Sequence, residues 1–124
     1  TKNRKKINKN LIVKGRKLEL KNFYDGIARF DFNELCDKNI GAEDYIELAK
    51  ICKFIVIDNL PNFSDQNINQ QQRFITLIDI LYEHKIKLMI SCNVHIDKLE
   101  SSNNLANVFK RTLSRIYQLT SPGN

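Results

Sequence analysis

One stretch, residues 54–93, constrains the fold of this chain more than any other. Two short apolar runs rich in β-branched residues, 54–57 and 86–90, predict strands, and their nearly continuous apolar character is typical of strands covered on both faces. Between them the apolar residues of 74–82 recur at helical spacing and form one broad stripe. A strand, a helix and a strand in this order predict a parallel βαβ unit.

Shorter elements surround this unit. Three strand-like runs precede it, with turn residues between them, and the third alternates apolar and polar residues as a half-buried antiparallel strand does. A helix is predicted before the unit and another after it; the runs and helices are 11–13, 18–20, 27–32, 42–52 and 105–119. The predicted fold class is α/β: a small antiparallel β meander followed by a helix, a parallel βαβ core and a carboxyl-terminal helix.

The positive charge of the chain is concentrated at its amino end. The net charge is +6, yet residues 1–22 carry nine Lys or Arg against one Glu, so the other 102 residues carry 11 bases and 13 acids. We therefore expect residues 1–10 to form a flexible basic arm and residues 11–121 to form a single α/β domain. The arm could bind nucleic acid or anionic lipid, and the simpler interpretation is a solvated linker.

Cysteine usage and hydropathy bear on the compartment. Three cysteines, with no C-x-x-C pair, are typical of a reducing intracellular environment. No apolar run approaches 18 residues, and no apolar segment follows the basic start, so we expect neither a transmembrane span nor a signal peptide. The chain begins at Thr1, which leads us to expect a fragment or a processed product.

The common catalytic motifs are absent from the sequence. It contains no G-x-x-x-x-G-K-[ST], G-x-S-x-G, H-E-x-x-H or G-x-G-x-x-G. His84 and His95 are isolated, and we expect both to lie at the surface or at helix ends. Cys92 follows a predicted strand, but no base accompanies it in sequence, so a nucleophilic thiol is disfavoured.

Asp58 is the weak candidate for a metal ligand. It lies at the carboxyl end of a predicted buried strand, beside a second strand that ends in Ser91, and nucleotide hydrolases place a Mg²⁺-binding acid at such a strand end. No Glu follows Asp58 and no phosphate loop precedes it. A metal-dependent enzyme that uses Asp58 together with Asp79 is therefore the least favoured function. The favoured interpretation is an aspartate that caps the turn before Pro61.

The last predicted helix carries a second candidate group. Arg111 and Arg115 are separated by four residues and so share one helix face, beside the polar Ser114. Paired arginines suit an interface or a nucleotide-sensing role, because guanidinium groups bind phosphate. Structural ion pairs to Asp44 or Asp79 are an equally good interpretation.

Several phrases of the sequence, taken together, resemble one family. They are VKGR (13–16), ARFDFNELC (28–36), GAEDYI (41–46), RFITLID (73–79), LYE (81–83) and FKRTLSR (109–115). In order and spacing they resemble the carboxyl-terminal part of the ZapE-like AAA-type ATPases, which are associated with bacterial cell division and mitochondrial protein quality control. The resemblance covers nearly the whole chain from Leu11 to Ser121.

The resemblance implies a P-loop ATPase that uses ATP and Mg²⁺, with its nucleotide-binding motifs outside this sequence. It therefore implies a fragment that does not hydrolyse ATP alone, binds no cofactor of its own and packs on the ATPase core of the same polypeptide, in a full-length protein that could be oligomeric. The implied location is cytoplasmic, including the periphery of the inner membrane, and mitochondrial in eukaryotic relatives.

The family's signature positions carry over residue by residue. The matching residues are Gly15, Arg16, Asp44, Tyr45, Arg73, Asp79, Arg111 and Arg115. Of these, Arg73 joins Arg111, Arg115 and Ser114 as a candidate for an interface or nucleotide-sensing role. The chain departs from the pattern in three places: Gln72 stands where the family usually has Arg, Gln118-Leu119 replaces Glu-Met, and Pro122-Gly123 replaces a final Glu-Tyr. These departures affect the contacts expected at the carboxyl terminus more than the fold.

Overall fold

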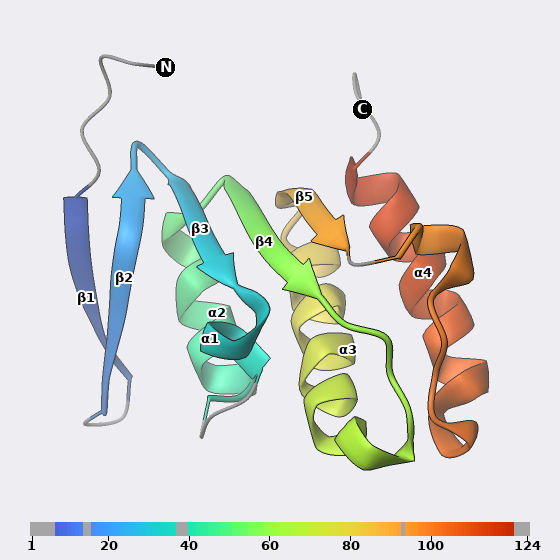
Figure 1. Ribbon diagram of the computed structural model, residues 1–124. Coiled ribbons are helices and arrows are strands. Elements are labelled where there is room, and N and C mark those ends of the chain that lie inside the picture. The colour runs from blue at the N-terminus through green and yellow to red at the C-terminus, as the bar shows by residue number, and fades with distance from the viewer. Residues whose placement is uncertain (1–6, 14–15, 37–39, 93, 121–124) are drawn as a thin grey trace.

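The structure is a computed structural model that describes residues 7–13, 16–36, 40–92 and 94–120, with side chains described from Phe23 onward. Its strands form one five-stranded sheet in the order β1-β2-β3-β4-β5 (Figure 1). β1, β2 and β3 pair antiparallel, and β3, β4 and β5 pair parallel. The bounds of the strands are Ile7–Val13, Arg16–Tyr24, Ile27–Asp31, Phe54–Leu60 and Lys87–Cys92.

Four α-helices and three short 3₁₀ helices complete the described part of the fold. α1 follows β3 directly, α2 leads into β4, α3 is the crossover between β4 and β5, and α4 closes the described chain (Figure 1). The bounds of α1–α4 are Phe32–Cys36, Ala42–Ile51, Ile68–Glu83 and Ala106–Thr120, and those of the 3₁₀ helices η1–η3 are Asp65–Asn67, Ile96–Lys98 and Asn103–Leu105. None of the described helices is long and apolar enough to cross a membrane.

The predicted α/β class, with a meander, a parallel βαβ unit and a final helix, is confirmed. Two details differ from the prediction. β1 begins at Ile7, so residues 7–10 belong to a strand although the sequence placed them in the basic arm; residues 1–6 lie outside the described part. β3 also belongs to both halves of the sheet, because it pairs antiparallel with β2 and parallel with β4.

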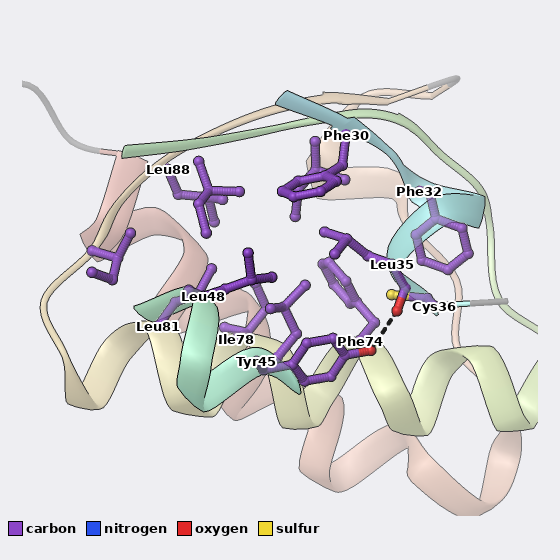
Figure 2. Close-up of a cluster of buried hydrophobic side chains, with 14 of the residues drawn as sticks. Phe30, Phe32, Leu35, Cys36, Tyr45, Leu48, Phe74, Ile78, Leu81 and Leu88 are labelled. Atoms are coloured by element: carbon purple, nitrogen blue, oxygen red, sulfur yellow. Dashed lines mark hydrogen bonds between the residues drawn. The ribbon is translucent and has the colours of Figure 1, made fainter. Parts of the chain in front are cut away.

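The prediction that the parallel strands are covered on both faces is wrong. In Figure 2 the strands run along one side of the apolar core and the helices along the other. Ile55, Ile57 and Leu88 point into this core and are buried, whereas Met89 is 56% exposed. The alternation arises because successive side chains of a strand point to opposite faces, and among the described residues the helices cover one face.

The uncovered side of the three parallel strands is called the open face below. Strand register places its residues in rows across the sheet, and the first two rows are Ile27–Phe54–Lys87 and Arg29–Val56–Met89. Asp31 and Asp58 are partners in the next row, near the carboxyl ends of the strands. The first two rows of the open face are thus mainly apolar, with one basic residue in each, and the next row is acidic.

The core between sheet and helices contains a cluster of four phenylalanines. Phe32 of α1, Phe63 of the loop after β4, Phe74 of α3 and Phe109 of α4 are all nearly inaccessible. The Phe63 ring lies 5.7 Å from the rings of Phe32 and Phe74 and 5.5 Å from that of Phe109, measured between centroids. Tilted and edge-on rings at these distances are the favourable arrangement for aromatic pairs. The cluster holds three helices and the Phe63 loop together.

α4 is rotated from the orientation that its apolar pattern suggests. Phe109 and Ile116, which belong to the apolar stripe of the helix, are buried, but Val108 and Tyr117 of the same stripe are 37% and 45% exposed. Thr112 is fully buried instead, and its hydroxyl donates a hydrogen bond to the Val108 carbonyl at 3.4 Å. A threonine can occupy such a position because its hydroxyl is satisfied within its own helix.

Candidate functional site

The two arginines of α4 converge on one aspartate of α3. Arg115 Nη1 forms an ion pair with Asp79 Oδ1, and Arg111 Nη2 lies 3.9 Å from Asp79 Oδ2. The Arg115 guanidinium carbon also lies 4.8 Å from the centre of the Tyr82 ring, a cation–π distance. These four residues are called the arginine cluster below. The sequence left Asp44 and Asp79 as alternative ion-pair partners of these arginines, and in the structure the partner is Asp79.

Exposure separates the two arginines. The Arg115 side chain is 25% exposed and has both a close carboxylate and an aromatic face, so its contacts anchor α4 to α3. The Arg111 side chain is 58% exposed, and its contact with Asp79 is at the outer limit for an ion pair. Ser114, between them in sequence, is exposed. Arg111 is therefore the member of the pair that can reach another molecule.

The signature residues of α2 and α3 lie elsewhere, around the carboxyl end of α1. Asp44 is 2% exposed and accepts a hydrogen bond from the Gly41 amide at 2.9 Å, which caps the start of α2. The fully buried Tyr45 hydroxyl donates to the Leu35 carbonyl at 2.6 Å, and burial raises the pKa of this hydroxyl. The hydroxyl in Figure 2 points out of the apolar cluster toward α1.

Arg73 completes this joint between three helices. Its Nη1 donates to the Cys36 carbonyl at 3.3 Å, so the last two residues of α1 each have a carbonyl satisfied by a side chain from another helix. Helix ends leave such carbonyls without intrahelical partners. Arg73 was predicted as an interface or nucleotide-sensing residue; its described contact is structural. Gln72 beside it is exposed and lines a shallow hollow with Gly41.

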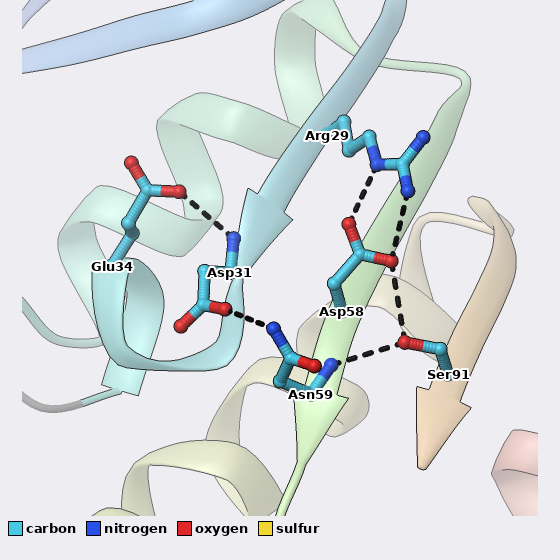
Figure 3. Close-up of polar contacts among 6 residues, drawn as sticks. All are labelled: Arg29, Asp31, Glu34, Asp58, Asn59 and Ser91. Carbon is cyan, nitrogen blue, oxygen red and sulfur yellow. Dashed lines mark hydrogen bonds and ion pairs between the residues drawn. The ribbon is translucent and has the colours of Figure 1, made fainter.

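The strand ends hold a third polar group, shown in Figure 3. Arg29 donates to both oxygens of Asp58, from Nε at 2.6 Å and from Nη2 at 3.2 Å, and the Ser91 hydroxyl donates to Asp58 Oδ1 at 3.2 Å. The hydrogen bond from Arg29 holds the pKa of Asp58 below its usual value and raises the pKa of the guanidinium. Asp58 is thus a charged partner of Arg29.

A β-bulge produces this arrangement. The register between β4 and β5 shifts between Ile57 and Leu60, and Asn59 adopts φ +64°. The Asn59 amide then donates to Ser91 Oγ at 3.0 Å, while its side chain donates to Asp31 Oδ1 at 2.6 Å. The bulge ties β3, β4 and β5 together at one end of the sheet.

This geometry does not favour Asp58 as a metal ligand, because a guanidinium already occupies both of its oxygens. Asp79 faces α4, where Arg115 binds it, so the two aspartates considered as a pair do not share a site. Within the described ranges, no group of three or more His, Cys, Asp or Glu side chains could hold a metal ion. Burial raises the pKa of the Cys92 thiol, which disfavours the reactive thiolate.

The remaining predicted residues are placed as follows. His84 caps the end of α3 and His95 precedes η2, both exposed as expected. Arg16 begins β2, and Gly15 lies outside the described residues. Two contributors were missed from the sequence: Arg29, whose alternation with buried Ala28 and Phe30 indicated an open-face position, and Tyr82, which lies three residues beyond Asp79 on α3.

The fold and the clusters define a two-layer α/β domain whose helices are fixed to each other by arginine and tyrosine contacts. The family model of the AFG1-like ATPases matches residues 1–123. The chain therefore belongs to the AFG1-like ATPase family.

Individual relatives agree with this membership. The chain is 35% identical over 89 residues to lactation elevated protein 1 homolog B of Danio rerio, covering 72% of this chain and 18% of that protein. It is 29% identical over 90 residues to the cell division protein ZapE of Escherichia coli K12, covering 73% of this chain and 24% of that protein. The chain thus spans less than a quarter of the length of these relatives. No solved structure matches it significantly.

Proposed function

We propose that this chain is the carboxyl-terminal domain of a ZapE-like ATPase, that it packs on the ATP-binding core of the same polypeptide, and that it presents Arg111 to an interface or to bound nucleotide. The observation that carries this proposal is that the two arginines of the arginine cluster differ in their contacts and in their exposure. Arg115 fixes α4 through Asp79 and Tyr82, while Arg111, one turn earlier, keeps a largely exposed guanidinium.

A fixed helix with one exposed arginine suits this role physically. A guanidinium that stabilises charge on a transferring phosphoryl group must be held in position before the reaction, since later ordering would cost side-chain entropy. Asp79 orients Arg111 without neutralising it at close range. ATP and Mg²⁺ would bind to the core of the full-length protein, with Arg111 approaching from this domain.

The test is ATP turnover by the full-length ATPase that contains this chain. We expect Arg111→Ala to lower kcat by about tenfold or more, because arginines that contact the transferring phosphoryl group contribute large factors. Arg111→Lys should not restore turnover, since an ammonium cannot reproduce the planar fork of donors. Lys110→Ala is the matched control, because Lys110 is an exposed neighbouring base on the same helix. Normal turnover and normal assembly of Arg111→Ala would refute the proposal.

A second candidate function is nucleic-acid binding by the basic amino-terminal segment. The observation in its favour is that Lys9, Arg16, Lys17 and Lys21 lie on β1 and β2, the two strands at one edge of the sheet. A basic hairpin at a sheet edge can follow a phosphate backbone.

A further inference from the structure

A groove of about 660 Å³ runs beside β5 at the opposite edge of the sheet from β1. One wall is β5 itself, the second is the segment that leads into η2, and the third is the last turn of α4, which Figure 1 places beside β5. Its apolar lining includes Met89, Ile90, Val94, Ile96, Tyr117 and Leu119. The groove is separate from the arginine cluster and from the strand-end group.

The backbone of β5 offers hydrogen-bonding groups to this groove. The Lys87 amide donates to the Lys53 carbonyl at 3.2 Å and so points toward β4. Successive peptide groups of a strand point in opposite directions, so the amides of Leu88 and Ile90 point toward the outer edge. The strand order of the described chain ends at β5. The side chain of Leu88 is buried in the core, yet Leu88 lines the groove. This agrees with a Leu88 backbone that faces the groove.

Exposed apolar side chains flank the same edge. Met89 is 56% and Tyr117 is 45% exposed, and both line the groove. They are the two most exposed of the large apolar side chains in the described part, and the other three, Tyr24, Ile46 and Val108, do not line it. An apolar groove along an open strand edge is the arrangement that binds an extended segment, because main-chain hydrogen bonds and side-chain pockets act together.

We propose that an extended, apolar segment from the remainder of the same polypeptide pairs with β5 as a sixth strand and fills this groove. This rests on the proposed function, in which the domain packs on the rest of the ATPase. Relatives matched by the chain are more than four times longer than the matched region, so most of a family member lies outside these residues. A segment in the same polypeptide also binds at high effective concentration.

The charges of the groove narrow the chemistry of that segment. Among the described residues, Lys87 contributes a positive charge to the lining, and the Asp97 carboxylate lies at the rim, where it accepts a hydrogen bond from the Tyr117 hydroxyl. With one charge of each sign at its margins and an apolar lining between them, the groove suits an apolar segment better than one rich in charges of either sign. Pairing would also remove an open strand edge, which otherwise invites association with other chains.

The test is hydrogen–deuterium exchange of the full-length protein, resolved to single amides in β5. We expect the outward amides of Leu88 and Ile90 to exchange within about tenfold of the inward amide of Met89, because both sets are hydrogen-bonded. Met89→Asp should accelerate exchange of the outward amides by roughly tenfold or more, since a carboxylate would be placed against an apolar segment. Amides of β4 serve as the folding reference. Ile46→Asp, at an exposed position of α2, is the matched control and should leave β5 unchanged.

Three outcomes would overturn the proposal. Outward amides that exchange about a hundredfold faster than the inward amide in the wild type would show an unpaired edge. Protection that disappears on dilution would show a separate chain in the groove. Equal exchange in Met89→Asp and wild type would show that the groove is empty. ATP turnover of the Arg111→Ala variant tests the proposed function independently. If β5 proved unpaired while Arg111→Ala still lost turnover, the strand pairing would be refuted and the proposed function would stand.

Discussion

The buried Tyr45 hydroxyl offers the sharpest test of how the helices are held together. Tyr45→Phe removes one oxygen and keeps the ring, which is fully buried in the core. The lost hydrogen bond to the Leu35 carbonyl is 2.6 Å long, and α1 ends one residue later, so the helix itself provides no replacement donor. A buried carbonyl left without a partner costs about 1–3 kcal/mol of unfolding free energy.

Urea denaturation followed by circular dichroism measures this cost. At a slope of about 1.5 kcal/mol per molar urea, the expected loss lowers the unfolding midpoint by roughly 0.7–2 M without changing the slope. Tyr82→Phe is the matched control, because its hydroxyl donates to Gln118 Oε1 at 3.0 Å in an exposed position, where water can replace the contact. The reasoning is refuted if Tyr45→Phe unfolds at the wild-type midpoint, or if both variants lose the same stability.

Three further predictions follow from the other clusters. Arg29 lowers the folded-state pKa of Asp58, so the stability from this pair is present above about pH 4 and is lost as the pH falls through the folded pKa. Asp58→Asn should therefore flatten the acid side of a curve of unfolding free energy against pH. Arg115→Ala should lower the unfolding free energy by about 1–2 kcal/mol, and Arg111→Ala by less than about 0.5 kcal/mol, in the same urea assay; equal losses would contradict the separation of their roles. If the basic residues of 1–22 bind nucleic acid, filter binding to a single-stranded oligonucleotide should weaken steeply with added salt, and lack of binding at low salt would eliminate that function.

Family membership and the open edge of the sheet both bear on what the rest of the full-length protein covers in this domain. The chain spans less than a quarter of these relatives, and within its described ranges one face of the parallel strands is uncovered and an apolar groove lies beside β5. Parallel sheets are normally covered on both faces. Under the two proposals above, the rest of the polypeptide supplies both the segment that fills the groove and the binding site for the nucleotide that Arg111 approaches.

The local elements of this protein follow from its sequence. Alternation in residues 27–32 predicted which side chains of β3 enter the core, and helical spacing in residues 74–82 predicted the buried stripe of α3. Asp44 lies in the first turn of α2, where the helix dipole favours negative charge, and it caps that helix. These features depend on short-range periodicity and on contacts between residues a few positions apart, which one sequence displays directly.

The pairing of distant groups required the tertiary structure. An i, i+4 spacing places Arg111 and Arg115 on one face of α4, but whether that face meets Asp79 depends on how α4 packs on α3. The apolar run of β5 likewise suggested two covered faces, because sequence periodicity does not record what lies outside a sheet; Met89 is exposed. The sequence alone thus determined the elements and the family, whereas packing between residues more than thirty positions apart decided which arginine is anchored and which edge is open.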